Sequence, residues 1–106
     1  MNQEQAIEQL KERIKPNDIL YTQLAHVSRS GMTRFIKVRL LKPDHTGECY
    51  PYDWTCAAAV ALGWKLSERY DAIEVGGCGM DMGFHLISNL SRVLYGDDYA
   101  IKHRWL

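Results

Sequence analysis

The sequence has little cysteine, no long hydrophobic run and no excess of either charge. Its three cysteines, Cys49, Cys56 and Cys78, are odd in number and form no CxxC pair, so we expect reduced thiols rather than a disulfide framework. No apolar run approaches the roughly 18 residues that span a bilayer. The polar segment Met1–Lys15 does not resemble a signal peptide. These absences favour a cytoplasmic protein that does not contact a membrane.

Charge is balanced, with 13 basic and 13 acidic residues in a chain of 106. Binding of duplex DNA usually needs a basic surface, so the composition argues against it while leaving room for a local basic patch. Hydrophobic residues make up 46% and charged residues 25%, which is ordinary for a globular protein with one core. We therefore expect residues 1–106 to form a single domain that needs no disulfide, metal or cofactor.

Hydrophobic periodicity predicts the order of helices and strands. Helices are expected over Gln3–Lys15, Trp54–Tyr70 and Met82–Tyr95. Strands are expected over Ile19–Val27, Thr33–Leu41, Ala72–Val75 and Tyr99–Trp105. Residues 42–52 are predicted to be a loop or an irregular edge. This order indicates an α+β fold, with a small antiparallel or mixed sheet of four strands and about three helices packed mainly on one face.

The expected helix ends have recognisable residues. Asp53 is a plausible N-cap of the second helix, and Gly96 fits the C-terminal cap of the third. Pro16 should stop the first helix. The core stripe of the third helix is predicted to be Phe84, Ile87, Leu90 and Leu94.

The first two strands are predicted to form a hairpin with Val27 opposite Thr33. This register makes one face apolar and sends the charged Lys37 and Arg39 to solvent, whereas a slip of one residue would put those charges inside. It also places His26 and Arg34 side by side at the loop end of the buried face. Two polar groups in such a place point to a functional role.

A glycine-rich turn between a strand and a helix is the strongest local feature. It contains Gly76, Gly77, Cys78 and Gly79, followed by Asp81. Such a turn exposes backbone N–H groups at the positive end of a helix and can hold an anion. The alternative is a tight turn in which Asp81 simply caps the helix. Because its carboxylate would compete with phosphate for those groups, Asp81 suits a sugar hydroxyl or a base amino group better.

The hairpin loop concentrates hydrogen-bond donors around one glycine. Its candidate ligand-binding residues are Ser28, Arg29, Ser30 and Arg34. Guanidinium groups bind phosphate and carboxylate through a bidentate fork, so this loop also suits an anion. A solvated hairpin loop is the alternative.

On the third helix, His85, Asn89 and Arg92 share a face, which a solvated surface explains as readily as a site does. Cys78 beside a histidine invites a nucleophile interpretation, yet a small buried cysteine is commoner. A zinc site drawn from Cys78, His26, His85 or His103 lacks the spacing of metal ligands. We therefore expect a structural Cys78 and no metal.

Three motifs resemble a family of small uncharacterised phage and prophage proteins: HVSRSGMTR at His26–Arg34, VGGCGMDMGF at Val75–Phe84 and YAIKHRWL at Tyr99–Leu106. The resemblance runs from about Asp18 to the end. Longer members insert a segment with Cys and His where this chain has only Gly96–Asp98, so a metal role of that insert does not carry over. The resemblance implies a phage product acting in an infected bacterium. It brings no established activity and no catalytic residues that could be carried over to this chain.

These features together favour a non-enzymatic binding protein. We expect it to capture a small anionic ligand, of nucleotide type, in a pocket formed by the two glycine-containing loops and His85, and so to counter host defence. Arg29 and Arg34 should provide most of the charge recognition. One alternative is a small enzyme acting on a nucleotide or nucleic acid through His26, His85, Cys78 or Asp81. Another is an inhibitor that contacts a host protein, and the oligomeric state, including a homo-oligomer, stays open.

Overall fold

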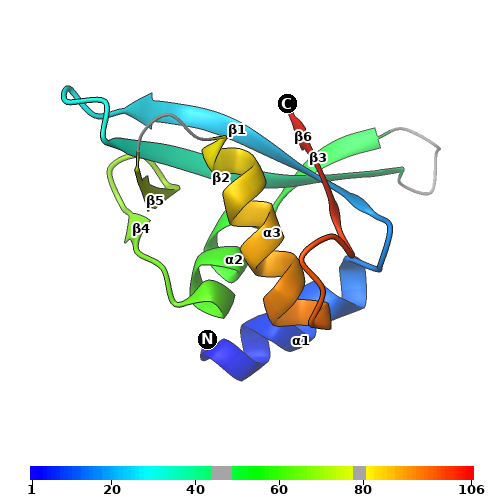
Figure 1. Ribbon diagram of the computed structural model, residues 1–106. Helices are drawn as coiled ribbons and strands as arrows, with labels where there is room; N and C mark the ends of the chain where they lie inside the picture. The colour runs from blue at the N-terminus through cyan, green and yellow to red at the C-terminus, as the bar shows by residue number, and fades with distance from the viewer. Residues whose placement is uncertain (44–48, 78–80) are drawn as a thin grey trace.

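The helices lie on one side of a mixed sheet in the computed structural model of the protein (Figure 1). The structure describes residues 1–43, 49–77 and 81–106. The helices are α1 (Gln3–Arg13), α2 (Thr55–Leu62) and α3 (Met82–Tyr95). The strands are β1 (Ile19–Val27), β2 (Thr33–Pro43), β3 (Cys49–Asp53), β4 (Leu66–Ser67), β5 (Ala72–Gly76) and β6 (Lys102–Trp105). The α+β class is confirmed, but the expected four strands are too few.

Strand β2 is the centre of the sheet. The strands follow one another in the order β4-β5-β2-β1-β6, and β3 pairs with β2 off this path. Strand β5 pairs with the first part of β2, at 33–36, and β3 pairs with the later part, at 39–43. Strand β6 runs parallel to β1, whereas the other pairs are antiparallel. The long β2 therefore positions every other element of the sheet except β6 and β4.

The core lies between the sheet and the three helices. On β1 and β2 it takes alternate residues, Leu20, Thr22, Ile36, Val38 and Leu40, all of which are buried. Helix α2 contributes small side chains, Ala57, Ala58, Ala59 and Ala61, which let its backbone approach the sheet closely. Because side chains alternate along a strand, the odd-numbered residues of β2, and those of β1 as far as Gln23, lie on the opposite, open face.

Helix α1 ends two residues earlier than predicted. Asn2 and Gln5 form a capping box at its start, with the Asn2 side chain accepting from the Gln5 N–H at 2.8 Å. At the other end Ile14 is already extended. A proline disfavours helical backbone in the residue before it, so Pro16 acts on Lys15 and the helix stops short of both.

The second helix is half as long as predicted, because it ends at Leu62 rather than at Tyr70. Gly63 takes a left-handed conformation, with φ 72°, and the Trp64 N–H reaches back to the Ala59 carbonyl at 3.0 Å. This pattern is a glycine C-cap, which satisfies the last carbonyls of a helix. The chain then forms β4, and the segment 68–71 is available to pack elsewhere.

The predicted hairpin register is correct up to Leu24, which pairs with Ile36. A β-bulge between Leu24 and His26 then shifts the pairing by one residue, so that His26 lies opposite Phe35. The extra residue carries His26 to the open face, where it is exposed. The prediction that His26 and Arg34 sit side by side on the buried face is therefore wrong.

Helix α3 has the predicted bounds, and Gly96 is its left-handed C-cap, with φ 72°. Three of the four predicted core residues of this helix are buried, but Phe84 is 45% exposed and packs against Tyr99 at a ring distance of 6.2 Å. The final strand begins at Lys102 rather than at Tyr99. Among the described residues, none of the helices is long and apolar enough to cross a membrane.

The start of α2 is fixed by a side-chain contact rather than by the predicted N-cap. Trp54 takes the N-cap position, and the Asp53 carboxylate accepts from the Thr55 N–H at 2.9 Å and the Thr55 hydroxyl at 2.5 Å. Burial raises the pKa of Asp53, but the hydrogen bonds from Thr55 and the charge of Arg39 outweigh it and hold that pKa below its ordinary value.

We predict that Asp53→Ala lowers the free energy of unfolding by about 1 kcal/mol at neutral pH, because the Thr55 N–H and hydroxyl lose their acceptor. The loss should shrink as the pH falls below the ordinary aspartate value of 3.8. A carboxylate whose pKa is depressed by folding stabilises the folded state above its unfolded pKa, and the stabilisation disappears on protonation. Urea unfolding across pH measures this.

Asp53→Asn is the matched control. It keeps an acceptor oxygen for the Thr55 N–H and should recover most of the loss at neutral pH. Equal stability of Asp53→Ala and the wild type at neutral pH would contradict the assignment.

Candidate functional site

The two glycine-containing loops meet at one end of the sheet. The Gly77 N–H donates to the Met32 carbonyl at 2.8 Å. Arg34 reaches across the junction, and its Nη1 donates to the carbonyls of Gly31 at 3.3 Å and Gly77 at 3.1 Å. The loops are thus adjacent, as the sequence predicts, and Arg34 holds them together.

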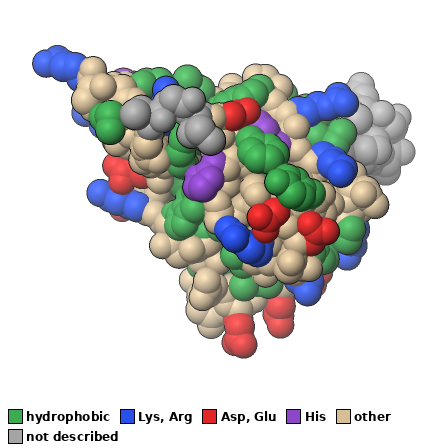
Figure 2. All heavy atoms as spheres, in the orientation of Figure 1, with side chains coloured by type: hydrophobic (Ala, Val, Ile, Leu, Met, Phe, Trp, Pro, Cys, Tyr) green, Lys and Arg blue, Asp and Glu red, His purple; other side chains and the backbone are tan. Residues whose placement is uncertain are grey.

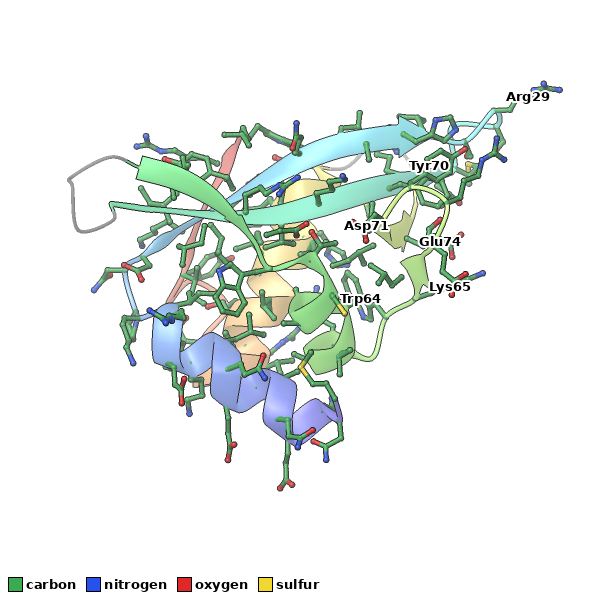
Figure 3. All side chains as sticks on the ribbon, turned by 180° about the vertical axis from the view of Figure 1, so that it is seen from behind. Arg29, Trp64, Lys65, Tyr70, Asp71 and Glu74 are labelled. Atoms are coloured by element: carbon green, nitrogen blue, oxygen red, sulfur yellow. The ribbon has the colours of Figure 1, made fainter. Side chains whose placement is uncertain are left out.

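The hairpin hydroxyls stabilise their own turn. Ser28 Oγ accepts from the Thr33 N–H at 3.1 Å, and Ser30 Oγ accepts from the Met32 N–H at 3.3 Å. Arg29 extends from the tip of the hairpin, away from the body of the molecule (Figure 3). The polar groups of this loop are therefore not directed at one common point.

The other predicted site residues lie in separate surroundings. His85 borders a hollow of about 280 Å³ together with Gly76, and its ring lies 6.1 Å from that of Trp64. Its helix neighbours Asn89, which is half-buried, and Arg92, which is exposed, share a face with it, as predicted, and Asn89 donates to the His85 carbonyl at 2.8 Å. In Figure 3 Trp64 lies at the end of α2 near the β4 segment.

Asp81 caps α3 by accepting from the Phe84 N–H at 3.0 Å. Its other oxygen lies 3.4 Å from the indole nitrogen of Trp105. Cys78 and Gly79 fall outside the described residues. Within the described ranges, no group of three or more His, Cys, Asp or Glu side chains is placed to hold a metal ion.

His26 forms an aromatic cluster on the open face of the sheet. Its ring stacks on Tyr70 with centroids 4.3 Å apart and planes 10° apart. Phe35 lies 5.7 Å from His26 and 4.7 Å from Tyr70. Tyr70 belongs to the segment that the glycine C-cap of α2 releases, and Figure 3 shows it beside the loop end of β1 and β2. The cluster attaches this segment to the open face.

A cationic groove lies next to this cluster. It has a volume of about 420 Å³ and is lined by seven residues: Gln23, Leu24, Ala25, Lys37, Arg39, Arg69 and Tyr70. Three of these seven carry a positive charge, and these three come from β2 and from the segment after β4. We call this hollow the open-face groove.

The charges of the open-face groove are only partly balanced. Arg39 Nη1 lies 3.5 Å from the Asp53 carboxylate, and the Arg39 side chain is 21% exposed. Its Nε is buried and has no hydrogen-bond partner within the described part of the chain. The guanidinium carbon of Arg69 lies 5.4 Å from the centre of the Tyr70 ring, a cation–π contact. An anion in the groove would therefore contact Arg39, which is fixed on β2, and Arg69, which packs on the Tyr70 ring.

Sequence reasoning placed Lys37 and Arg39 on the correct face but assigned them to plain solvent. Arg69 and Tyr70 were placed inside a helix, so their approach to β2 was missed. Gly63 was the available signal, because a glycine after an apolar helical run favours a C-cap. The bulge that moves His26 has no comparable local signal.

A second polar cluster joins the last strand to the core. Thr22 Oγ1 lies 2.6 Å from His103 Nε2, a hydrogen-bond distance. Thr22 is fully buried, so its hydroxyl is closed to any substrate, which argues against a nucleophilic role. Burial lowers the pKa of His103 below its ordinary value, and the negative charge of Asp81 opposes the shift. The pair acts as a joint between β1 and β6.

No protein-family model, curated protein or solved structure matches the chain. The functional argument therefore rests on the residues of this chain and their geometry.

We predict that Gly83→Ala destabilises the fold. A Cβ at this position would lie 2.5 Å from Thr22 Oγ1, 2.7 Å from Trp105 Cζ2 and 2.8 Å from His103 Nε2. Overpacking of this kind costs about 1–3 kcal/mol, more than the gain of up to about 1 kcal/mol from replacing a helical glycine. Gly76→Ala is the control, because nothing lies within 4 Å of the added carbon. Thermal melts should show a loss for Gly83→Ala alone.

The His103 joint predicts a pH dependence of stability. Its folded pKa lies below the ordinary value of 6.5, so the unfolded chain takes up the proton more readily. The contribution of neutral His103 to the free energy of unfolding is therefore complete above pH 6.5 and declines as the pH falls below that value. His103→Gln should remove this component. Urea unfolding of both proteins between about pH 8 and pH 5 brackets the histidine range, and parallel stability curves would disprove the role.

Proposed function

We propose that the protein binds a small anionic ligand of nucleotide type in the open-face groove and does not turn it over. The observation that carries the proposal is the gathering of Lys37, Arg39 and Arg69 around one hollow beside the Tyr70 ring. The ligand chemistry is the one expected from the sequence. Its position moves from the glycine loops to the open face.

The groove offers both parts of a nucleotide a suitable surface. Guanidinium and ammonium groups form charge-assisted hydrogen bonds with phosphate oxygens. The guanidinium plane of Arg69, which lies over the Tyr70 ring, offers a flat surface on which a base can stack. Gln23, opposite Lys37 in the sheet, adds an amide that can donate and accept hydrogen bonds with a base edge or a sugar.

The two loops have a different part in this proposal. Arg34 and the serine hydroxyls are engaged in hydrogen bonds that hold the loop junction together. The junction supports the strand ends on which His26 and Phe35 stand. We therefore assign the glycine loops to the framework of the site.

The resemblance to phage proteins supports a purpose for such binding. A phage product in the cytoplasm of an infected bacterium that sequesters a nucleotide signal would counter host defence.

Calorimetry against mono-, di- and cyclic nucleotides tests the proposal. We expect Lys37→Gln and Arg69→Gln each to weaken binding by about ten- to a hundredfold, since a charge-assisted hydrogen bond contributes about 1.5–3 kcal/mol. Arg29→Gln makes the same charge change at the hairpin tip and should have little effect. All variants should first be shown to melt like the wild type.

The two placements of the ligand give opposite results. Loss of affinity in Arg29→Gln, with Lys37→Gln and Arg69→Gln unaffected, would return the ligand to the glycine loops. Absence of binding to every nucleotide would refute the proposed function.

A further inference from the structure

The open-face groove is part of a longer basic surface. Strand register places Arg104 of β6 next to Tyr21 of β1, and Tyr21 next to Arg39 of β2. These three side chains form a row across the open face. Arg39 also lines the open-face groove, so the row continues the groove toward the edge strand.

Further rows follow along the strands toward the hairpin. Gln23 and Lys37 form the next row. His26 and Phe35 form a third, covered by Tyr70. Successive rows on one face of a strand lie about 7 Å apart, twice the rise of one residue. The surface therefore extends well beyond the footprint of a single phosphate.

The open face carries several cations although the chain as a whole has no net charge. Helix α1 carries exposed residues of both signs, Glu4, Glu8 and Glu12 with Lys11 and Arg13, and Figure 2 shows acidic side chains at the lower end of the molecule, over α1. On the open face, Asp53 is paired with Arg39 and Glu74 with Lys65. The other cations of the open face are Lys37 and Arg69, which line the open-face groove, and Arg104 on β6.

We infer that the open face binds a single-stranded nucleic acid, whose backbone runs past Arg104, Lys37 and Arg69. This inference rests on the proposed function, because the open-face groove would hold one nucleotide unit of the strand. A row of cations follows a phosphate backbone, and aromatic side chains stack unpaired bases. Tyr21 is half-buried, and His26, one face of which stacks on Tyr70, is exposed, so ring surface is available along the same path.

A single strand fits this face better than a duplex does. The faces of the bases are covered by neighbouring pairs in a duplex, whereas bases of a single strand can turn onto protein rings. The cations lie on a sheet, and the rings lie between and beside them. Duplex DNA would present its phosphates but leave the rings without partners.

Substitution of Arg104 distinguishes binding of a nucleic-acid strand from binding of a single nucleotide. It is exposed on the edge strand β6, and it belongs to the row beyond the open-face groove. Arg104→Gln should therefore weaken a bound oligonucleotide without affecting a bound mononucleotide. Arg13→Gln, on the exposed surface of α1, makes the same charge change on the opposite layer and is the matched control.

Fluorescence anisotropy with a labelled oligothymidylate and the matching oligouridylate tests the inference. A length of about eight nucleotides lies within the site sizes of small single-strand-binding folds. The logarithm of affinity should fall with the logarithm of salt concentration with a slope of about −2, since each phosphate contact of a single strand contributes about −0.7. Arg104→Gln should make the slope shallower by about 0.7, and Arg13→Gln should leave it unchanged.

Three results would overturn the inference. In the first, the protein binds the oligonucleotide no more tightly than it binds thymidine monophosphate, and Arg104→Gln has no effect. That result would leave the proposed function intact but contradict binding of a strand. Equal binding of a duplex of the same length would remove the preference for single strands. Absence of binding to both oligonucleotide and mononucleotide would remove the inference and the proposed function together.

Discussion

The antiparallel pairing of β1 with β2 is the constraint on which the rest of the structure depends. It sends Thr22 and Val38 toward the helices and Gln23 and Lys37 to the opposite face. The three helices cover the first face only (Figure 1). A slip of one residue would exchange the two faces and bury charge. One pairing therefore determines both the hydrophobic core and the chemistry of the surface left open.

Contacts between segments that are distant in the sequence bring the side chains of the open face together. The glycine cap at Gly63 ends α2 early, and the chain that follows brings Arg69 and Tyr70 to β2. The β-bulge in β1 turns His26 outward, where it stacks on Tyr70. A cation from the segment and a cation from the strand thus come to border one groove. Neither would do so in the uninterrupted helix and regular hairpin that the sequence suggested.

The parts that could be predicted from the sequence are those with local causes. The bounds of α3 and the hairpin register up to Leu24 follow from periodicity and from glycine and proline signals. The bulge and the pairing of β3 depend on tertiary contacts, which no local pattern encodes. The sequence predicted an anion site at the glycine loops. The predicted adjacency of the two loops is correct. It could not predict that Arg34 would be occupied by the carbonyls of Gly31 and Gly77.

The central claim is that the anionic ligand lies on the open face, and mapping by NMR tests it most directly. Backbone amide shifts of the ¹⁵N-labelled protein should be followed during titration with a nucleotide. The account predicts that the largest changes fall on Gln23, Lys37 and the segment 69–70, with little change on α1. Changes centred on the hairpin tip and the glycine turn, with the open face unperturbed, would contradict it.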